Sequence, residues 1–395
     1  MTANLNALGL VCALGQGKQA VADALFAGDA SGMRRQGGWV AERELSIGAV
    51  PGELPAMPAG LEDCQSRNNQ LLLAAALEIE PQLRAAIERH GLDRVGIVLG
   101  TSTSGIQEAS EGIGEHLRSG TLPDDYRYPQ QELAAPAAFL AAWLGTRGPA
   151  YCISTACTSS ARALMSARRL LALGVCDAVI CGGVDSLCGL TLNGFSALEA
   201  VSAEPCNPLS RNRNGINIGE GAALFLLDRE PGPIALLGAG ACSDAHHISA
   251  PEPSGIGAQR AMRQALADAG TCAEGIDYLN LHGTATAHND AMESQATAAL
   301  FPAGVPVSST KPLTGHTLGA AGALEAAFCW LALSEHNRDR LLPPHLWDGE
   351  ADPELPALHL VRHGGTLEKA GGRRLMSNSF AFGGSNISLI IGDAP

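Results

Sequence analysis

The sequence is poor in three features that identify common classes of protein. Aromatic residues make up 4% of its 395 residues while 47 are glycine, which fits closely packed α/β layers better than a β-sandwich. The net charge of −14 argues against nucleic-acid binding through a general basic surface. No 18-residue apolar run stands out, and the first residues lack the basic start and apolar core of a signal peptide. We therefore expect no membrane span and a cytoplasmic location.

The cysteines follow no pattern that is typical of a disulfide framework or a zinc site. There are 11 of them, an odd number, and no two are spaced as Cys-x-x-Cys. A reduced protein without a structural or catalytic metal is the simplest interpretation. No resident cofactor is expected either.

Apolar runs that are typical of buried strands alternate with stretches of helical spacing, which predicts an α/β fold. The predicted strands cover residues 4–14, 95–100, 178–183, 219–228, 234–244, 276–281 and 387–391. The predicted helices cover residues 18–27, 69–90, 136–144, 158–173, 257–269, 290–300 and 318–335, and residues 28–64 are expected to be irregular. The pattern begins again near residue 231, so we expect two similar halves, 1–230 and 231–395.

The stretch around Cys157 is the centre of this organisation. A small polar turn, ISTACTSSA (153–161), leads directly into the predicted helix 158–173. Free N–H groups and the helix dipole at such a position favour a thiolate, which makes Cys157 the best nucleophile candidate. On this segment alone, a buried cysteine that only packs is about equally plausible.

Three later segments combine glycines with one or two reactive side chains next to predicted strands. They are LHGTATAHND (281–290) with His282, SSTKPLTGHTLGAAG (308–322) with Lys311 and His316, and NSFAFGGSN (378–386) with Phe382. Glu325 follows the second segment on a predicted helix. Taken singly, each residue is more often structural or solvated than catalytic, but loops of this composition on a rigid sheet are typical of active sites.

Together with the cysteine turn, these motifs resemble the elongating β-ketoacyl-acyl carrier protein synthases. The motifs TACTSSA, HGTATAHND, KPLTGHTLGAAGALE and NSFAFGGSN occur in the family's order, and the resemblance covers nearly the whole chain. It implies a thiolase-like fold, with two similar halves in five alternating α/β/α/β/α layers. It also implies the activity of a ketosynthase, the decarboxylative condensation of an acyl chain with malonyl-acyl carrier protein.

The resemblance assigns a role to each candidate residue. Cys157 would carry the acyl chain, and His282 and His316 would stabilise the enolate that forms when malonyl loses carbon dioxide. Backbone N–H groups of Cys157 and Phe382 would form an oxyanion hole. The remaining roles are electrostatic support by Lys311 and Glu325, binding of the pantetheine arm by Thr284 and Thr286, and gating of the acyl tunnel by Phe382. Ile106, Phe195 and Ile218 are candidates for the tunnel wall.

The chain also departs from the family pattern at two places. Ala381 precedes the gating phenylalanine where the family commonly has glycine, so we expect a stiffer gate. Residues 207–215, NPLSRNRNG, lack the arginine, the aromatic residue and two aspartates that are usual there, which puts carrier docking at this segment in doubt. Other candidates for carrier docking are Arg34, Arg35, Arg67, Arg127, Arg211 and Arg213. These departures suggest a specialised pathway, such as aryl polyene synthesis.

Two further classes of protein remain as alternatives. One is a non-catalytic subunit that sets chain length in a ketosynthase heterodimer, although that subunit type lacks the cysteine. The other is a degradative thiolase, which would carry a second catalytic cysteine in its C-terminal glycine motif. The expected partners are acyl and malonyl carrier proteins and a second chain, either a homodimer copy or a related ketosynthase-like subunit.

Overall fold

Two sheets of matching strand order form the framework of the protein. The computed structural model describes residues 3–395. The first sheet has the order β1-β9-β7-β5-β6 and the second the order β10-β15-β14-β11-β12-β13. In both, the first three strands are antiparallel and the remaining strands are parallel. The sheets meet where Asn4 of β1 pairs with Ala235 of β10, so hydrogen bonds join them into one twelve-stranded sheet within the described residues.

The strands of this framework vary in length and are mostly buried. Those of the first sheet are β1 (Asn4–Cys12), its hairpin partner β2 (Gly15–Gln16), β5 (Val95–Gly100), β6 (Ala150–Ile153), β7 (Ala178–Asp185) and β9 (Gly221–Asp228). Those of the second sheet are β10 (Ile234–Ser243), β11 (Tyr278–Asn280), β12 (Pro306–Ser308), β13 (His359–Leu360), β14 (Arg374–Ala381) and β15 (Ser385–Asp393).

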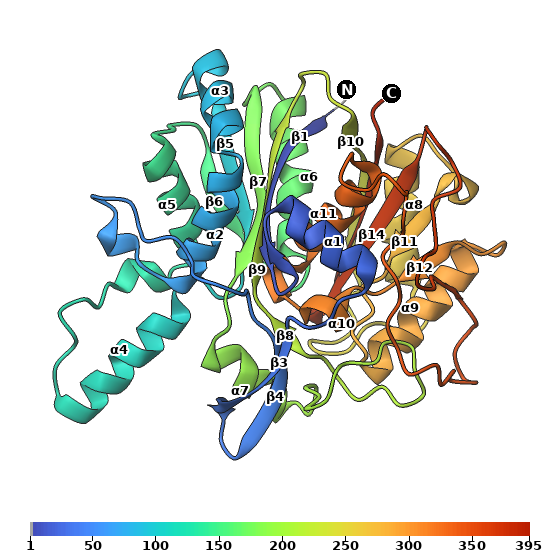
Figure 1. Cartoon of the computed structure of the whole chain (residues 1–395), viewed down its shortest axis with the longest axis horizontal. Helices are drawn as coiled ribbons and strands as arrows, with labels where there is room; N and C mark the ends of the chain where they lie inside the picture. Colours follow the sequence, from blue (N-terminus) through green and yellow to red (C-terminus); the bar gives the residue numbers. More distant parts are fainter. Residues whose placement is uncertain (1–2) are drawn as a thin grey trace.

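Helices complete a five-layer arrangement, which Figure 1 shows nearly edge-on. The first sheet is covered on its outer face by α2 (Arg67–Glu78), α3 (Glu80–His90) and α5 (Ala135–Leu144). The central layer contains α6 (Ser159–Ala172) and α11 (Ala321–Leu333), with α1 (Lys18–Ala27) beside them. The second sheet is covered by α8 (Ile256–Asp268) and α9 (Ala287–Leu300). The predicted α/β class with five layers is confirmed. No helix within residues 3–395 is long and apolar enough to cross a membrane.

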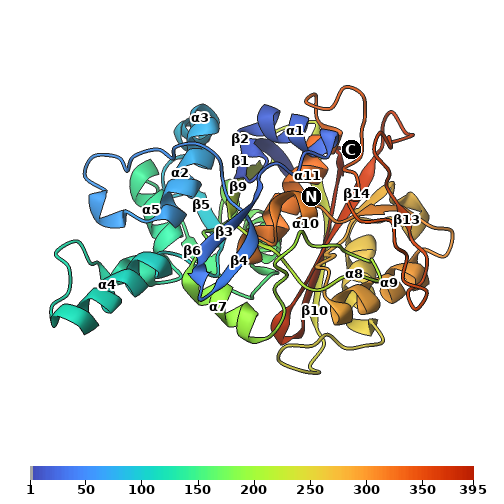
Figure 2. The same cartoon turned by 60° about the horizontal axis from the view of Figure 1, so that its bottom comes forward.

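Several predicted elements were wrong in detail. The predicted helix 69–90 is two helices, because Ile79 leaves the helical conformation (φ −120°, ψ 14°) two residues before Pro81. Residues 28–64 are not all irregular, since they contain the hairpin of β3 (Met33–Val40) and β4 (Arg43–Gly48), which pairs with β8 (Ile218–Gly219). Figure 2 shows this hairpin beside α7 (Gly189–Ala197), a helix that the sequence pattern did not predict. The projecting helix α4 (Ile106–Ser119) was also missed.

The carboxyl ends of the parallel strands place all four sequence motifs at one edge of the fold. Cys157 lies after β6, His282 after β11, and Phe382 after β14. Lys311 begins the short helix α10 (Lys311–Thr314) after β12, and His316 follows it. In α/β proteins, loops at the carboxyl ends of strands commonly form the ligand site.

Candidate active site

A tight turn presents Cys157 between β6 and α6. Ala156 has a left-handed backbone (φ 53°), which is unusual for a residue with a side chain and is found mainly where the surroundings enforce it. The Thr158 hydroxyl donates to the Thr155 carbonyl at 2.7 Å and holds the turn closed. This turn places Cys157 just before α6, which begins at Ser159. The cysteine is buried, with 6% of its surface exposed.

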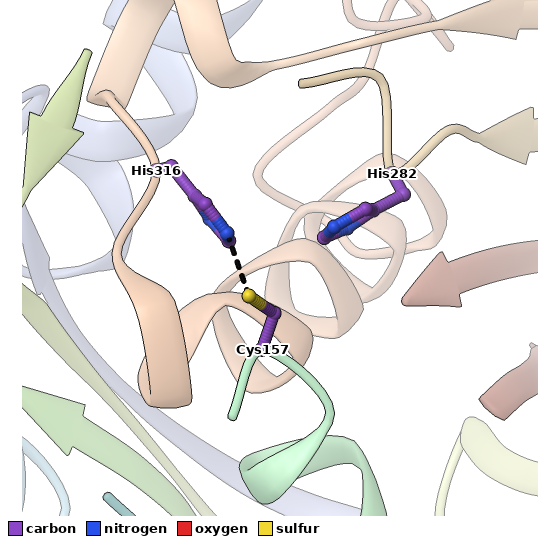
Figure 3. A group of neighbouring side chains, drawn as sticks. All are labelled: Cys157, His282 and His316. Carbon is purple, nitrogen blue, oxygen red and sulfur yellow. Dashed lines mark hydrogen bonds between the residues drawn. The ribbon is translucent and has the colours of Figure 1, made fainter. Parts of the chain in front are cut away.

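Two buried histidines face the sulfur from separate loops of the second half. The Nε2 atom of His316 lies 3.0 Å from the Sγ atom of Cys157. The ring of His282 stands edge-on to that of His316, with 5.3 Å between the ring centroids. Figure 3 shows both rings pointing toward the cysteine. The structure therefore brings together the three residues that the sequence motifs predicted to meet.

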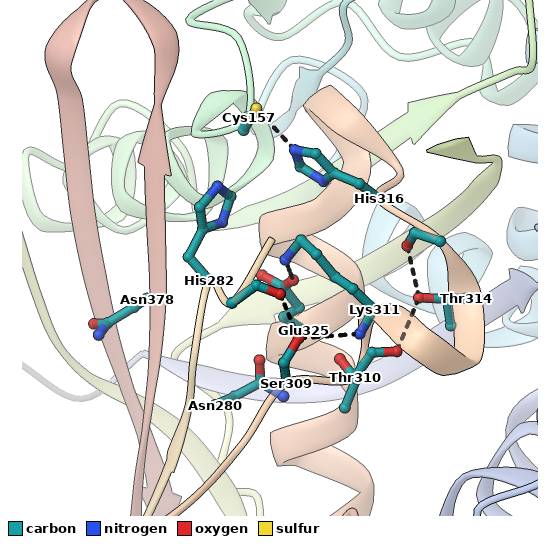
Figure 4. A network of polar contacts seen from close by, with 12 residues as sticks. Cys157, Asn280, His282, Ser309, Thr310, Lys311, Thr314, His316, Glu325 and Asn378 are labelled. Atoms are coloured by element: carbon teal, nitrogen blue, oxygen red, sulfur yellow. Dashed lines mark hydrogen bonds and ion pairs between the residues drawn. The ribbon is translucent and has the colours of Figure 1, made fainter. Parts of the chain in front are cut away.

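An ion pair lies below the histidines. Lys311 Nζ contacts Glu325 Oε1 of α11, and the two side chains are 2% and 4% exposed. The Ser309 hydroxyl links this level to the histidine loop, because it donates to the Gly283 carbonyl at 2.7 Å and accepts the Lys311 N–H at 3.3 Å. The network is drawn in Figure 4.

A carboxylate that the sequence analysis missed fixes the position of His282. Glu293 of α9 accepts the backbone N–H groups of His282 and Gly283 at 2.8 and 2.7 Å. Burial raises the pKa of Glu293 to about 7, and these two hydrogen bonds oppose the rise. The signal that could have pointed to Glu293 is its position on the predicted helix that directly follows the His282 motif, one turn after Asn289.

Burial determines the charge state of the site. It raises the pKa of Cys157 to about 12, against the opposing effect of the Lys311 charge. It also lowers the pKa of His282 and of His316 well below the usual value, so both imidazoles are neutral at pH 7. Glu325 has its pKa raised to about 7 by the same burial, again opposed by Lys311. The prediction that the helix N-terminus makes Cys157 a low-pKa thiol was wrong for this geometry, because desolvation outweighs it.

A cavity of about 620 Å³ leads from the protein surface to Cys157 and both histidines. Thr284 and Thr286 line it, and their hydroxyl oxygens lie 2.9 Å apart. Phe382 stands at the cavity with 37% of its surface exposed, and its ring centroid is 5.6 Å from that of Phe195. Of the three expected tunnel residues, Phe195 lines this cavity. Ile218 does not line it but belongs to the apolar cluster on which Phe195 packs, and Ile106 begins α4.

Most of the arginines considered for carrier docking are already paired within the chain. Arg67 is held by the fully buried Glu220, and Arg213 forms a largely buried pair with Asp352, so neither is a free surface charge. Arg127 pairs with Asp63, Arg35 with Glu204, and Arg211 lies 3.9 Å from Glu350. Arg34 is exposed.

The ligand atoms of Cys157, His282 and His316 all lie within 4.8 Å of one another. One sulfur and two imidazole nitrogens form a donor set that suits zinc and other thiophilic ions. The sequence predicted no metal here.

A five-layer fold built from two equivalent halves, with one cysteine and two histidines at the base of an acyl-sized cavity, defines a condensing enzyme of the thiolase-like class. Residues 62–231 match the family described as "Beta-ketoacyl synthase, N-terminal domain", and residues 235–346 match "Beta-ketoacyl synthase, C-terminal domain". The chain belongs to the β-ketoacyl synthase family, and its enzyme class is β-ketoacyl-acyl carrier protein synthase.

Individual relatives agree with this assignment. The 3-oxoacyl-[acyl-carrier-protein] synthase 2 of Rhizobium meliloti is 39% identical over 62% of this chain and 61% of its own length. The protein of the same name from Synechocystis is 31% identical over 78% of this chain and 76% of its own. A solved ketosynthase, ApeO, in complex with its chain length factor ApeC from Xenorhabdus doucetiae, superposes with a TM-score of 0.95. It is 47% identical over 100% of this chain and 98% of its own.

Proposed function

We propose that this chain carries an acyl group on Cys157 and condenses it with malonyl-acyl carrier protein, with His282 and His316 as the residues that stabilise the enolate. The observation that carries the proposal is the contact of His316 Nε2 with Cys157 Sγ, beside the edge-on ring of His282, at the base of the cavity. The alternative of a non-catalytic chain-length subunit is not favoured, because Cys157 is present and correctly placed.

The first half-reaction is the transfer of the acyl chain to the enzyme. The sulfur of Cys157 attacks the carbonyl carbon of the carrier thioester, and the carrier sulfur leaves. The proton lost by the Cys157 thiol is transferred to the departing carrier sulfur, which leaves as a thiol. Since the pKa of Cys157 is raised, the sulfur needs a base at the moment of attack. His316 Nε2, at 3.0 Å, is the group in position to take that proton.

The second half-reaction is decarboxylation and condensation. Malonyl on its carrier loses carbon dioxide, and the electron pair of the broken C–C bond enters the thioester as an enolate. Neutral imidazoles with a proton on Nε2 donate hydrogen bonds to that enolate oxygen without giving up the proton. His316 accepts at Nε2 during loading, so its proton must move from Nδ1 to Nε2 before this second step. The carbanion then attacks the acyl thioester, Cys157 leaves, and the product is a β-ketoacyl chain on the carrier. We assign the oxyanion hole of this step to the backbone N–H groups of Cys157 and Phe382.

The other site residues act on these two steps from a distance. Lys311, paired with Glu325, places a positive charge below both histidines, which disfavours their protonation. Thr284 and Thr286 offer hydroxyls to the amides of the pantetheine arm. Phe382 closes the cavity and swings aside for the acyl chain. We also propose a division of labour between the halves, with the cysteine on 1–230 and the other groups on 231–395.

We further propose that the chain works as a heterodimer with a chain-length-factor-like subunit, in a specialised pathway of the aryl polyene type. The support is the 47% identity to a ketosynthase solved with its chain length factor. In addition, β6 is the outermost strand of the first sheet, so its edge is free to pair with a second chain. A cytoplasmic location fits the eleven free cysteines.

Intact-mass analysis with a panel of acyl-carrier proteins tests the function. The wild-type chain, alone and with a candidate partner subunit, is mixed with each acyl-carrier and then with malonyl-carrier. We expect a mass gain on Cys157 that is discharged as β-ketoacyl-carrier. Cys157→Ala should show neither, while Cys272→Ala, which removes an exposed cysteine, should behave as wild type. Discharge without a β-ketoacyl product, or acylation that survives Cys157→Ala, would refute the proposal.

A further inference from the structure

His345 is a buried histidine outside the catalytic cavity that the family motifs do not include. It follows α11 in the chain, after Pro343 and Pro344, and is 6% exposed. Its backbone N–H donates to the Val361 carbonyl at 2.8 Å, which anchors it beside the second sheet. The side chain therefore has a fixed position between the end of β12 and the loop of residues 207–214.

Both ring nitrogens of His345 are engaged, and together they fix its tautomer. The Ser309 N–H donates to Nδ1 at 3.1 Å. Nε2 therefore carries the proton and donates it to the Pro208 carbonyl at 3.1 Å. Ser309 is fully buried and follows the last residue of β12, so without the imidazole its N–H would lose its acceptor.

Ser309 transmits this contact to the catalytic loops. Its hydroxyl donates to the carbonyl of Gly283, the residue after His282, and accepts the N–H of Lys311. The two loops are in close contact at Gly283. A Cβ atom added to this glycine would lie 2.5 Å from the Ser309 Cβ, which is too close for a side chain. A shift of Ser309 must therefore move the peptide that carries His282.

Pro208 connects the other side of the imidazole to the cavity wall. The next residue, Leu209, donates its N–H to the buried carboxylate of Asp290 at 2.8 Å, which holds this part of the loop against α9. Farther along the same loop, Arg213 and Asn214 line the catalytic cavity. His345 thus joins the loop that shapes the cavity to the loop that carries an enolate-stabilising histidine.

We propose that His345 is a positioning residue for condensation, acting through Ser309 on His282 and Lys311 and through Pro208 on the cavity wall. This inference rests on the proposed function. The two contacts serve different steps: the Ser309 contact sets the rate of decarboxylative condensation, and the Pro208 contact sets the binding of the acyl carrier.

Two substitutions separate the contacts. His345→Asn keeps an acceptor near the Nδ1 position for the Ser309 N–H but has no group at the Nε2 position. His345→Gln places a donor near the Nε2 position for Pro208 and leaves the Ser309 N–H without an acceptor. Loading of Cys157 is measured by intact mass over a range of acyl-carrier concentrations. Condensation is measured as a single turnover of preloaded enzyme with malonyl-carrier.

For His345→Gln we expect condensation to slow about ten-fold with loading within about two-fold of wild type, because a small misplacement of a catalytic group is costly. For His345→Asn we expect near-normal condensation and a several-fold higher KM for the acyl carrier. Ser309→Ala, which leaves His345 intact, should reproduce the selective loss in condensation even where a His345 variant folds poorly. His363→Gln, at an exposed histidine of the same segment, is the matched control.

Equal losses in both steps that track a loss of stability would overturn the inference and leave His345 a structural residue. Unchanged kinetics in His345→Gln and Ser309→Ala would also overturn it. Failure of the proposed function gives a different result, since the wild-type chain would then load no acyl group at all.

Discussion

His316 Nε2 lies 3.0 Å from Cys157 Sγ, and burial favours the neutral form of both groups. The resting pair is therefore a thiol beside an imidazole, and not the thiolate and imidazolium of many cysteine enzymes. A neutral imidazole whose Nε2 is free can receive the thiol proton during loading, and the tautomer with its proton on Nε2 can donate that N–H to an enolate afterwards. The same position of His316 can thus serve loading, which needs a proton acceptor, and decarboxylation, which needs a hydrogen-bond donor.

Alkylation of Cys157 should keep accelerating into alkaline pH. Because its pKa is raised to about 12, the thiolate fraction grows about ten-fold per pH unit between pH 7 and 9. We expect the iodoacetamide rate at Cys157, followed by peptide mass spectrometry, to rise without a plateau in that range. A plateau near pH 7 would mean that the α6 N-terminus and Lys311 outweigh burial.

The Lys311–Glu325 pair should show strong coupling in a double-mutant cycle. Glu325→Leu leaves the buried Lys311 charge unpaired, and Lys311→Met leaves the buried Glu325 carboxyl without its partner, so each single change costs about 3 kcal/mol in the free energy of unfolding. The double variant removes both charges and should cost less than the sum of the two single losses, as measured by urea denaturation. Its condensation rate should stay low, because the charge below the histidines is missing. Additive losses in stability would contradict a coupled pair.

The three side chains that the structure brings together could be singled out in the sequence because each lies in a contiguous motif at the end of a strand. Cys157, His282 and His316 come from distant segments, but each segment has its own local pattern of glycine and small polar residues. Parallel strands then bring their carboxyl ends to one edge, and the family resemblance predicted that the three residues meet there.

Other features depend on contacts that no local pattern reports. The imidazole of His345 joins Pro208 and Ser309, residues 137 and 36 positions away, and none of the three lies in a periodic stretch. The pKa of Cys157 was mispredicted because a helix N-terminus is visible in sequence while burial is not. The hairpin of β3 and β4 was missed because most of β3 is exposed and lacks an apolar alternation.

Thiophilic metal ions should inhibit the enzyme at its active site. The three ligand atoms of Cys157, His282 and His316 are close enough for one ion to displace the thiol proton and bind all three. We expect cadmium or zinc to block loading reversibly, with activity restored by a chelator. Cadmium should produce a thiolate charge-transfer absorption that Cys157→Ser abolishes and Cys272→Ser retains. Absorption that persists in Cys157→Ser would place the ion elsewhere.

Replacement of Ala381 by glycine should speed loading of long acyl chains. In the closed gate the backbone of Ala381 is extended (φ −117°, ψ 157°), a conformation that alanine adopts as readily as glycine. If the swing of Phe382 passes through positive φ at this residue, alanine adds about 1 kcal/mol to the barrier, and Ala381→Gly accelerates loading about five-fold. A two-carbon acyl donor, which needs no space behind the gate, is the control. Equal rates for both variants with a long chain would show that the hinge lies elsewhere.

The pH dependence of stability should identify His345 as a neutral buried group. Burial lowers its pKa to about 4 in the folded chain, whereas an unfolded chain has the ordinary value near 6.5. Between these values the unfolded chain binds a proton that the folded chain does not, so the contribution of His345 is complete above pH 6.5 and declines as the pH falls. The decline amounts to about 3 kcal/mol at pH 4.

The comparison with His345→Asn isolates this effect. The variant has no imidazole to take up the proton, while Glu293 and Glu325 titrate in both proteins and their contributions cancel. Urea denaturation at pH 7, 6, 5 and 4 should therefore show the advantage of wild type over His345→Asn shrinking steadily with acid. A constant difference would mean that His345 takes up its proton at the same pH in the folded and unfolded chains, and its hydrogen bond from the Ser309 N–H would then have to be reassigned.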